Sequence, residues 1–378
     1  MLKFVKGLGI IIGLMFGAGI FALPFVISKA GIFWGTIHLA IALAITLLLL
    51  FLYAEVSYYT EGSHRFAGYV ELILGKKTKF FTFLITVASY YGILLAYGVL
   101  AGLFLSNFFG GLYPALLTFL FFVFGAFFIF LKLEKIALVN FYLTIPLFGF
   151  VVYFVVVSLP FVKLSNFAGG PGLFSFSNGW FLPYGVWLFA LSAMAAIPEA
   201  KDIFKNSPIK DFKKVITWSV LLSAFFYCLF IFAILGVSGE GTSEDSFSGV
   251  LDVLGGGIIL AGSAMGFWAV FTSFLSLGTD LRDMFRFDFG LSKIFSWFLV
   301  AVPPAVIFYL GLQDFTRILG LVGSLGVGIM GTLVILMARK MRKNHQLFHS
   351  LKFGGFVEIV AMAAILIAVV YEIWNLFV

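Results

Sequence analysis

Long apolar stretches, separated by short polar segments, make up almost the whole chain. A helix needs about 20 mainly apolar residues to cross the hydrocarbon core of a bilayer, and about eleven segments approach that length. The predicted spans cover residues 7–28, 33–58, 79–107, 112–131, 136–160, 179–198, 214–238, 256–279, 293–311, 316–338 and 355–377. This pattern predicts an all-α integral membrane protein with a single transmembrane domain over residues 1–378.

Three longer polar segments interrupt the apolar pattern. Residues 62–77 and 241–254 are predicted to form surface helices on opposite sides of the membrane. Residues 164–178 are rich in Gly, Ser and Asn, and they are predicted to form a loop.

Composition supports the membrane assignment. Hydrophobic residues make up 62% of the 378 residues and charged residues only 11%, so a solvated surface could not be formed. The only cysteine, Cys228, excludes an internal disulfide and a cysteine-based metal cluster. We therefore expect no metal and no cofactor apart from a coupling ion.

The basic residues predict the orientation. Cytoplasmic loops of membrane proteins carry an excess of Lys and Arg. If the N-terminus is cytoplasmic, the 24 basic residues all lie on the inside except Lys29, Lys163 and Arg317. The C-terminus then lies outside the plasma membrane. The net charge of +7 thus reflects topology, and nucleic acid is not an expected partner.

The first span contains a segment that favours an interrupted helix. Residues 17–24 read GAGIFALP, in which two glycines and a proline weaken helical backbone near the middle of the membrane. Irregular backbone at that depth is tolerated only where protein or a cavity satisfies its polar groups. The segment is predicted to be either a kink or an unwound binding segment.

The sixth span repeats this feature. Residues 191–198 read LSAMAAIP, again small residues followed by proline. Spans one and six are five apart, as expected if two five-span halves are related by inversion. We expect residues 1–162 to form the first half, 163–340 the second half, and 341–378 an extra C-terminal helix.

Three motifs carry a family resemblance: GIIIGLMFGAGIFALPFVISKAG in span one, LFALSAMAAIPEAKDIF in span six and FTSFLSLGTDLRDMF at the end of span eight. They resemble the amino acid/polyamine/organocation permeases, most closely the amino acid/auxin permease branch with the bacterial aromatic amino acid permeases. The resemblance implies a LeuT-like five-plus-five fold with broken helices 1 and 6. It also implies cation-coupled transport of amino acids. GAGIFALP is less polar than the corresponding motif of the bacterial aromatic permeases.

The spans carry almost no charge at depth, which indicates a zwitterionic substrate. No Lys, Arg, Asp or Glu occurs between Lys6 and Lys29, between Lys163 and Pro198, or from 253 to 279. A carboxylate can meet the N–H groups of one broken helix, and an ammonium the carbonyls of the other. The predicted substrate-binding residues are Gly17, Ala18, Gly19, Ile20, Tyr90, Tyr91, Phe189, Ser192, Ala193 and Phe267. For the aromatic residues, ordinary packing within the bundle is the alternative.

Span eight offers a candidate cation site. Ala269, Thr272 and Ser273 form the pattern A-x-x-T-S, which matches the sodium site of sodium-coupled members of this fold. Two hydroxyls, with backbone carbonyls near Gly13 and Phe16, would give a hard cation the oxygen ligands it prefers. Hydroxyls that bond to their own helical turn are the alternative.

Glu55, near the end of span two, is the candidate for proton coupling, because a carboxylate within a membrane span is usually functional. The alternative is a salt-bridged residue close to the interface. Sodium and proton coupling therefore both stay open.

Together these features predict a secondary active transporter, with no enzymatic activity, that moves a neutral amino acid, aromatic or hydrophobic ones included, with Na⁺ or H⁺. The alternatives are a transporter of another small zwitterion and a membrane sensor or assembly subunit that does not transport. The sequence does not identify protein partners.

Overall fold

The computed structural model describes residues 2–62, 64–131, 136–168, 179–344 and 354–375. Within these ranges every regular element is a helix. The first half of the chain contains α1 (Leu2–Met15), α2 (Gly19–Ala30), α3 (Ile32–Tyr59), α4 (Phe66–Leu74), α5 (Lys76–Asn107), α6 (Pro114–Leu131), α7 (Ile136–Ser158), η1 (Leu159–Phe161) and η2 (Leu164–Phe167).

The second half begins with a short helix and ends with the peripheral helix α16. It contains α8 (Leu182–Leu191), η3 (Met194–Ala196), α9 (Ile197–Phe204), α10 (Ile209–Ser238), η4 (Gly239–Gly241), η5 (Ser248–Val250), α11 (Leu251–Leu254), α12 (Gly256–Asp283), η6 (Met284–Asp288), α13 (Lys293–Tyr309), α14 (Phe315–Leu321), η7 (Val322–Val327), α15 (Gly328–Asn344) and α16 (Gly354–Asn375).

Within these residues, most of the eleven predicted spans are long apolar helices. Seven helices are long and apolar enough to cross a membrane, and the bent pair α1 and α2 adds an eighth span. Three shorter apolar helices, Pro114–Phe130, Ile145–Phe161 and Lys293–Tyr309, correspond to predicted spans four, five and nine. Each predicted span therefore has a helical counterpart.

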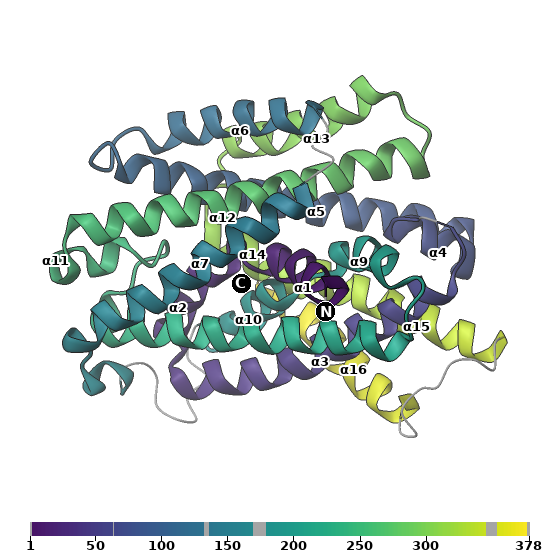
Figure 1. The fold of residues 1–378 in the computed structure, drawn as a ribbon, viewed down its shortest axis with the longest axis horizontal. Helices are drawn as coiled ribbons and strands as arrows, with labels where there is room; N and C mark the ends of the chain where they lie inside the picture. The colour runs from purple at the N-terminus through teal and green to yellow at the C-terminus, as the bar shows by residue number, and fades with distance from the viewer. Residues whose placement is uncertain (1, 63, 132–135, 169–178, 345–353, 376–378) are drawn as a thin grey trace.

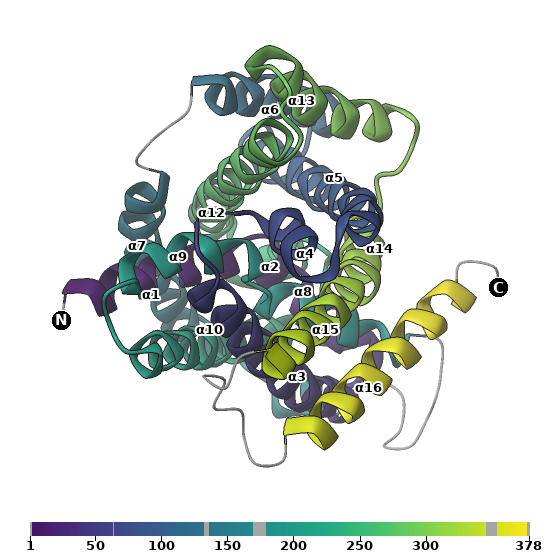
Figure 2. The same cartoon turned by 90° about the vertical axis from the view of Figure 1, so that its right-hand side faces the viewer.

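The long helices run side by side along the longest axis of the molecule (Figure 1). Viewed along them, α2, α8 and α9 lie in the middle of the bundle, and α6 and α13 lie together at one edge (Figure 2). The helix α16 lies at the periphery beside α15. Helices α2 and α8 are thus enclosed by the rest of the bundle, whereas α1 runs outward to the N-terminus at the edge of the view.

Only one of the two predicted surface helices is present. Helix α4 (Phe66–Leu74) occupies the first of them, whereas residues 241–254 contain only the turn η5 and the four-residue α11. The prediction of a helix over 241–254 was wrong because local hydrogen bonds compete with it. The Asp245 carboxylate accepts bonds from the Ser243 hydroxyl and from both the N–H and the hydroxyl of Ser248. Of the predicted 164–178 loop, residues 169–178 lie outside the described residues.

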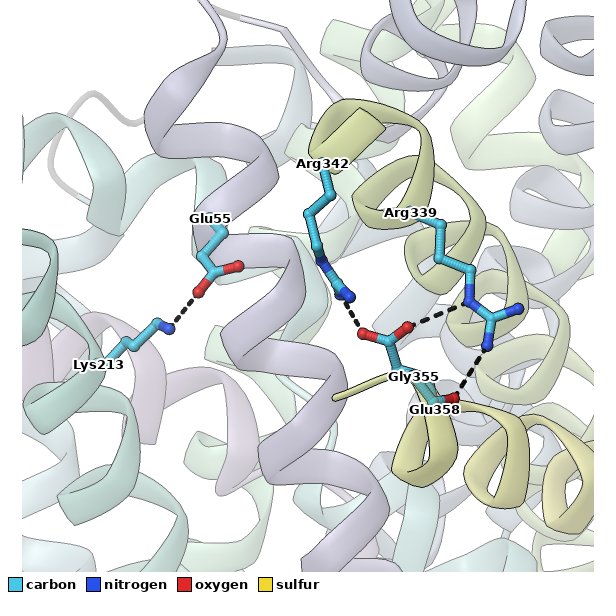
Figure 3. Close-up of polar contacts among 6 residues, drawn as sticks. All are labelled: Glu55, Lys213, Arg339, Arg342, Gly355 and Glu358. Atoms are coloured by element: carbon cyan, nitrogen blue, oxygen red, sulfur yellow. Dashed lines mark hydrogen bonds and ion pairs between the residues drawn. The ribbon is translucent and has the colours of Figure 1, made fainter. Parts of the chain in front are cut away.

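An ion cluster attaches α16 to α15 (Figure 3). The Glu358 carboxylate is 1% exposed and accepts from Arg339 Nε at 3.1 Å and from Arg342 Nη2. Arg339 also donates to the Gly355 carbonyl at 3.4 Å. A buried carboxylate needs such partners, so these bonds fix how the last span docks on span ten.

Close backbone packing joins span six to span ten, where six residues form the π-helical segment η7. A Cβ added to Gly323 would lie 1.8 Å from the Gly185 carbonyl oxygen, and one added to Gly185 would lie 2.5 Å from the Gly320 oxygen. Only glycine fits at this crossing, since any side chain would force the two backbones apart.

We expect Gly323→Ala to destabilise the protein by about 1–3 kcal/mol, the usual cost of overpacking a close contact. Gly149→Ala is the matched control, because a Cβ at Gly149 would meet nothing within 4 Å. Thermal unfolding of the two purified variants measures the effect. Equal melting temperatures for both variants would contradict the close packing of α8 on η7.

Candidate functional site

Two breaks in the helical backbone meet in the middle of the bundle. Helix α1 ends at Met15 and α2 begins at Gly19, and the two helices are bent by 51°. In span six, α8 ends at Leu191, Ser192 is extended with φ −73° and ψ 130°, and Ala193 has φ −135° and ψ 32°. Both predicted breaks are therefore present, at the small residues that precede each proline.

The glycines of the first break allow neighbouring helices to approach closely. A Cβ added to Gly17 would lie 2.8 Å from Tyr97 Oη and 3.0 Å from Ser273 Oγ. One added to Gly19 would lie 2.7 Å from the Cα of Ala190. Backbone groups of the break thus stand directly against α5, α12 and α8.

A tyrosine that the sequence did not single out links the two breaks. Tyr227 of α10 is fully buried, and its hydroxyl lies 2.6 Å from the Met15 carbonyl oxygen and 3.1 Å from that of Ala190. These carbonyls belong to the last turns of α1 and α8, where helices leave acceptors without partners inside the helix. One side chain therefore serves acceptors from both broken spans.

A cavity of about 60 Å³ lies beside the breaks. Of the predicted substrate-binding residues, Tyr90, Phe189 and Ser192 line it. The sequence did not predict the other residues that line the cavity, which are Leu14, Met15, Ser89, Ile93, Tyr97, Met194, Ala195, Leu277, Val322, Gly326, Val327 and Met330. Gly17, Ala18, Gly19, Ile20 and Ala193 are buried within the breaks themselves.

Two of the predicted substrate-binding residues lie elsewhere. The Tyr91 hydroxyl donates to the Leu299 carbonyl of α13 at 2.6 Å. The Phe267 ring packs against Phe121 of α6 and stacks on Phe271, with centroids 5.9 Å apart in both pairs. These two aromatic residues pack within the bundle and do not line the cavity.

Polar contacts next to the cavity join α5 and α12 to the loop before α4, and that loop to α9. The Tyr90 hydroxyl donates to Asp280 Oδ2 at 3.0 Å, and Arg65 Nε lies 3.1 Å from Asp280 Oδ1. The neighbouring Asp280 carboxylate raises the pKa of the Arg65 guanidinium above its ordinary value. Lys201 donates to the Thr60 and Gly62 carbonyls, which holds the loop that carries Arg65.

The span-eight hydroxyls differ in their bonding. Thr272 donates to the Ala269 carbonyl at 3.1 Å, the bond within its own turn that was the alternative to a cation site. Ser273 is 0% exposed and, unlike Thr272, makes no hydrogen bond within its own helix. Its Oγ and the Tyr97 hydroxyl both lie beside Gly17, and the two side chains interact with each other.

The other residues proposed for ion coupling have clear positions. Gly13 is buried in the last turns of α1, and the Phe16 amide donates to the Ile12 carbonyl at 2.9 Å. Glu55 is 5% exposed and forms an ion pair with Lys213 of α10 (Figure 3). The second Glu55 oxygen has no hydrogen-bond partner in the described part of the chain. Its role in proton coupling stays a prediction.

The family model of the tryptophan/tyrosine permeases matches residues 1–375. The chain belongs to the tryptophan/tyrosine permease family. This membership confirms the resemblance to amino acid permeases, and it identifies the protein as a multi-pass membrane permease and not an enzyme. No curated protein matches the chain significantly.

A solved structure confirms the fold of this permease. The crystal structure of MhsT in complex with L-phenylalanine matches with a TM-score of 0.73 and 18% sequence identity. The match covers 97% of this chain and 98% of that chain. The likeness extends over the whole bundle, so the LeuT-like fold with its two broken helices is present here.

We expect Asp280→Asn to loosen the packing next to the cavity, because it removes the charge that holds both Arg65 and Tyr90. The measurement is the rate at which a membrane-impermeant maleimide labels Ser89→Cys in a Cys228→Ala background. Asp280→Asn should raise this rate severalfold, whereas Asp252→Asn, on the exposed face of α11, should leave it unchanged. Equal rates in both variants would show that Asp280 does not keep the cavity closed.

Proposed function

We propose that this permease is a secondary active transporter that moves a neutral aromatic amino acid together with a cation by alternating access. The observation that carries the proposal is the cavity at the meeting point of two broken helices. Among the described residues, those that line it include three aromatic side chains and no Lys, Arg, Asp or Glu. An uncharged cavity suits a zwitterion better than an ion with a net charge.

The half-helix ends supply the polar recognition in this proposal. The N-terminal end of α2, at Gly19, has no side-chain cap, and its N–H groups with partial positive charge would bind the substrate carboxylate. The C-terminal end of α8, at Leu191, presents carbonyls to the ammonium. The amino acid would thus be bound through its backbone groups, whatever its side chain.

The cavity walls support an aromatic side chain. Phe189, Tyr90 and Tyr97 supply rings, and Ile93 and Leu277 supply apolar surface. The family name, and the L-phenylalanine bound to MhsT, agree with this choice. The observed cavity has room for only a few waters, so the flexible side chains of Met194 and Met330 would have to move aside.

We infer that the coupling cation is Na⁺, bound by the Thr272 and Ser273 hydroxyls with carbonyls of Gly13, Phe16 and Ala269. The buried Ser273 oxygen, which makes no bond within its own helix and lies beside Gly17, supports this choice. Glu55 is held by Lys213 in an ion pair, which opposes the protonation cycle that a proton carrier needs.

Uptake into proteoliposomes tests both the substrate and the ion. Radiolabelled tryptophan, tyrosine and phenylalanine should accumulate under an inward Na⁺ gradient. We expect Ser273→Ala to lower accumulation at least tenfold, because the cation loses a ligand. Ser276→Ala is the matched control, since Ser276 lies one turn further along α12 and donates to the Thr272 carbonyl.

Other outcomes would redirect the proposal. Accumulation driven by a proton gradient, lost in Glu55→Gln and retained in Ser273→Ala, would assign coupling to Glu55. Accumulation of another zwitterion would replace the substrate. Substrate binding without any transport would favour a sensor or assembly subunit.

The glycines of the first break provide a further prediction. We expect Gly19→Leu to abolish substrate binding, because its side chain would collide with the Ala190 backbone and displace the N–H groups of α2. Gly149→Leu, where a Cβ meets open space, should bind normally. Equilibrium binding of labelled substrate to both variants measures the effect, and unchanged affinity in a folded Gly19→Leu protein would remove the break from the binding site.

We also propose the topology that the basic residues predict. The N-terminus would be cytoplasmic and the C-terminus outside the plasma membrane. Residues 1–162 and 163–340 would form the inverted halves, with 341–378 as the additional helix. The ion pairs Glu55–Lys213 and Glu358–Arg342 would then lie at the cytoplasmic ends of their spans.

A further inference from the structure

The hydroxyl of Tyr227 has one proton and two acceptors. Its oxygen lies 2.6 Å from the Met15 carbonyl oxygen and 3.1 Å from the Ala190 carbonyl oxygen. A tyrosine hydroxyl can donate only one hydrogen, so the two carbonyls compete for it. The shorter distance shows that Met15 is the stronger partner in this arrangement.

The two acceptors belong to different half-helices, which would move relative to each other in the proposed alternating access. Met15 ends α1, and both Leu14 and Met15 line the cavity. Ala190 lies in the last turn of α8, on the other broken span. Both are C-terminal helix ends with partial negative charge, so each is stabilised by a donor, and Tyr227 supplies one donor for both.

The tyrosine ring itself is held firmly. It packs against Phe16, with ring centroids 5.0 Å apart, and against Trp187, with centroids 6.4 Å apart. Trp187 donates from Nε1 to the Gly35 carbonyl of α3 at 3.1 Å. The hydroxyl is therefore positioned by α10 and by Trp187 of α8, and also by Phe16, the residue that directly follows α1.

We propose that Tyr227 is a positioning residue that couples the two broken helices. In the observed arrangement its hydroxyl donates to the Met15 carbonyl and so holds the end of α1. When α1 moves away, the O–H turns to donate to the Ala190 carbonyl, and the proton stays on the tyrosine oxygen, so that the donor is not left unpaired. The inference rests on the proposed alternating-access function, and it assigns Tyr227 the role of a latch between the two states.

Labelling of the cavity in the absence of substrate tests this role. In nanodiscs, Ser89→Cys with Cys228→Ala reports how often the cavity opens to a membrane-impermeant maleimide. We expect Tyr227→Phe to raise the labelling rate by about fivefold to tenfold, the effect of losing one buried hydrogen bond. Tyr184→Phe is the matched control. Its hydroxyl is also buried but has no hydrogen-bond partner in the ranges described, and it should not change the rate.

Two further measurements separate coupling from a structural role. We expect Tyr227→Phe to lower kcat for uptake at least fivefold, with substrate Kd within twofold of the parent protein. Para-aminophenylalanine at position 227 keeps the ring and offers two N–H donors, so both carbonyls can be bound at once. The maleimide labelling rate of this variant should not exceed that of the parent protein. This test can be made even if Tyr227→Phe does not fold.

The outcomes distinguish this inference from the proposed function. Equal labelling rates in Tyr227→Phe and Tyr184→Phe, or a para-aminophenylalanine variant that labels faster than the parent, would overturn the latch. Since labelling needs no substrate, a failure of amino acid uptake in the parent protein would affect the proposed function alone.

Discussion

The requirement that every backbone polar group find a partner inside the membrane governs this structure. No water is available in the hydrocarbon core, so a break in a helix survives only where protein supplies the missing bonds. The breaks near Gly17 and Ser192 meet that condition in the middle of the bundle. The single Tyr227 hydroxyl lies within hydrogen-bond distance of a carbonyl at each break, and Gly17 and Gly19 bring α5, α12 and α8 against the freed backbone. The cavity is a consequence of this arrangement.

The same requirement explains where charges occur. The ion pairs of Glu55, Glu358 and Asp280 lie at or near helix ends, and no charged residue of the described chain lines the cavity. Charge near the ends joins helix to helix, as Glu358 joins α16 to α15. The middle of the bundle is left to backbone dipoles and hydroxyls, which can bind a polar solute without a fixed charge of their own.

The sequence predicted those parts of the fold that leave a local signal. Span length and the Gly and Pro of GAGIFALP and LSAMAAIP identify the helices and both breaks, because each depends on neighbouring residues alone. Local sequence did not predict the roles of three aromatic residues, Tyr227, Tyr91 and Phe267. Each is one aromatic residue in an apolar helix, and only the rotation of that helix within the bundle decides which neighbour it faces. The prediction of a helix over residues 241–254 was wrong for another reason, because the side-chain hydrogen bonds of Asp245 outweigh a weak helical preference.

An uncharged cavity also gives a physical reason for the proposed symport. A cation that binds alone loses its hydration shell, and a few oxygen ligands offset only part of that desolvation cost. A zwitterion that binds alone has no fixed cation near its carboxylate. If the cation binds at Ser273, beside Gly17, and the carboxylate at the N-terminus of α2, which begins two residues later at Gly19, each offsets the cost of the other. Such mutual stabilisation is reciprocal, so the ion strengthens amino acid binding as much as the amino acid strengthens ion binding. Coupling then follows from the absence of permanent charge, and it needs no dedicated titrating residue.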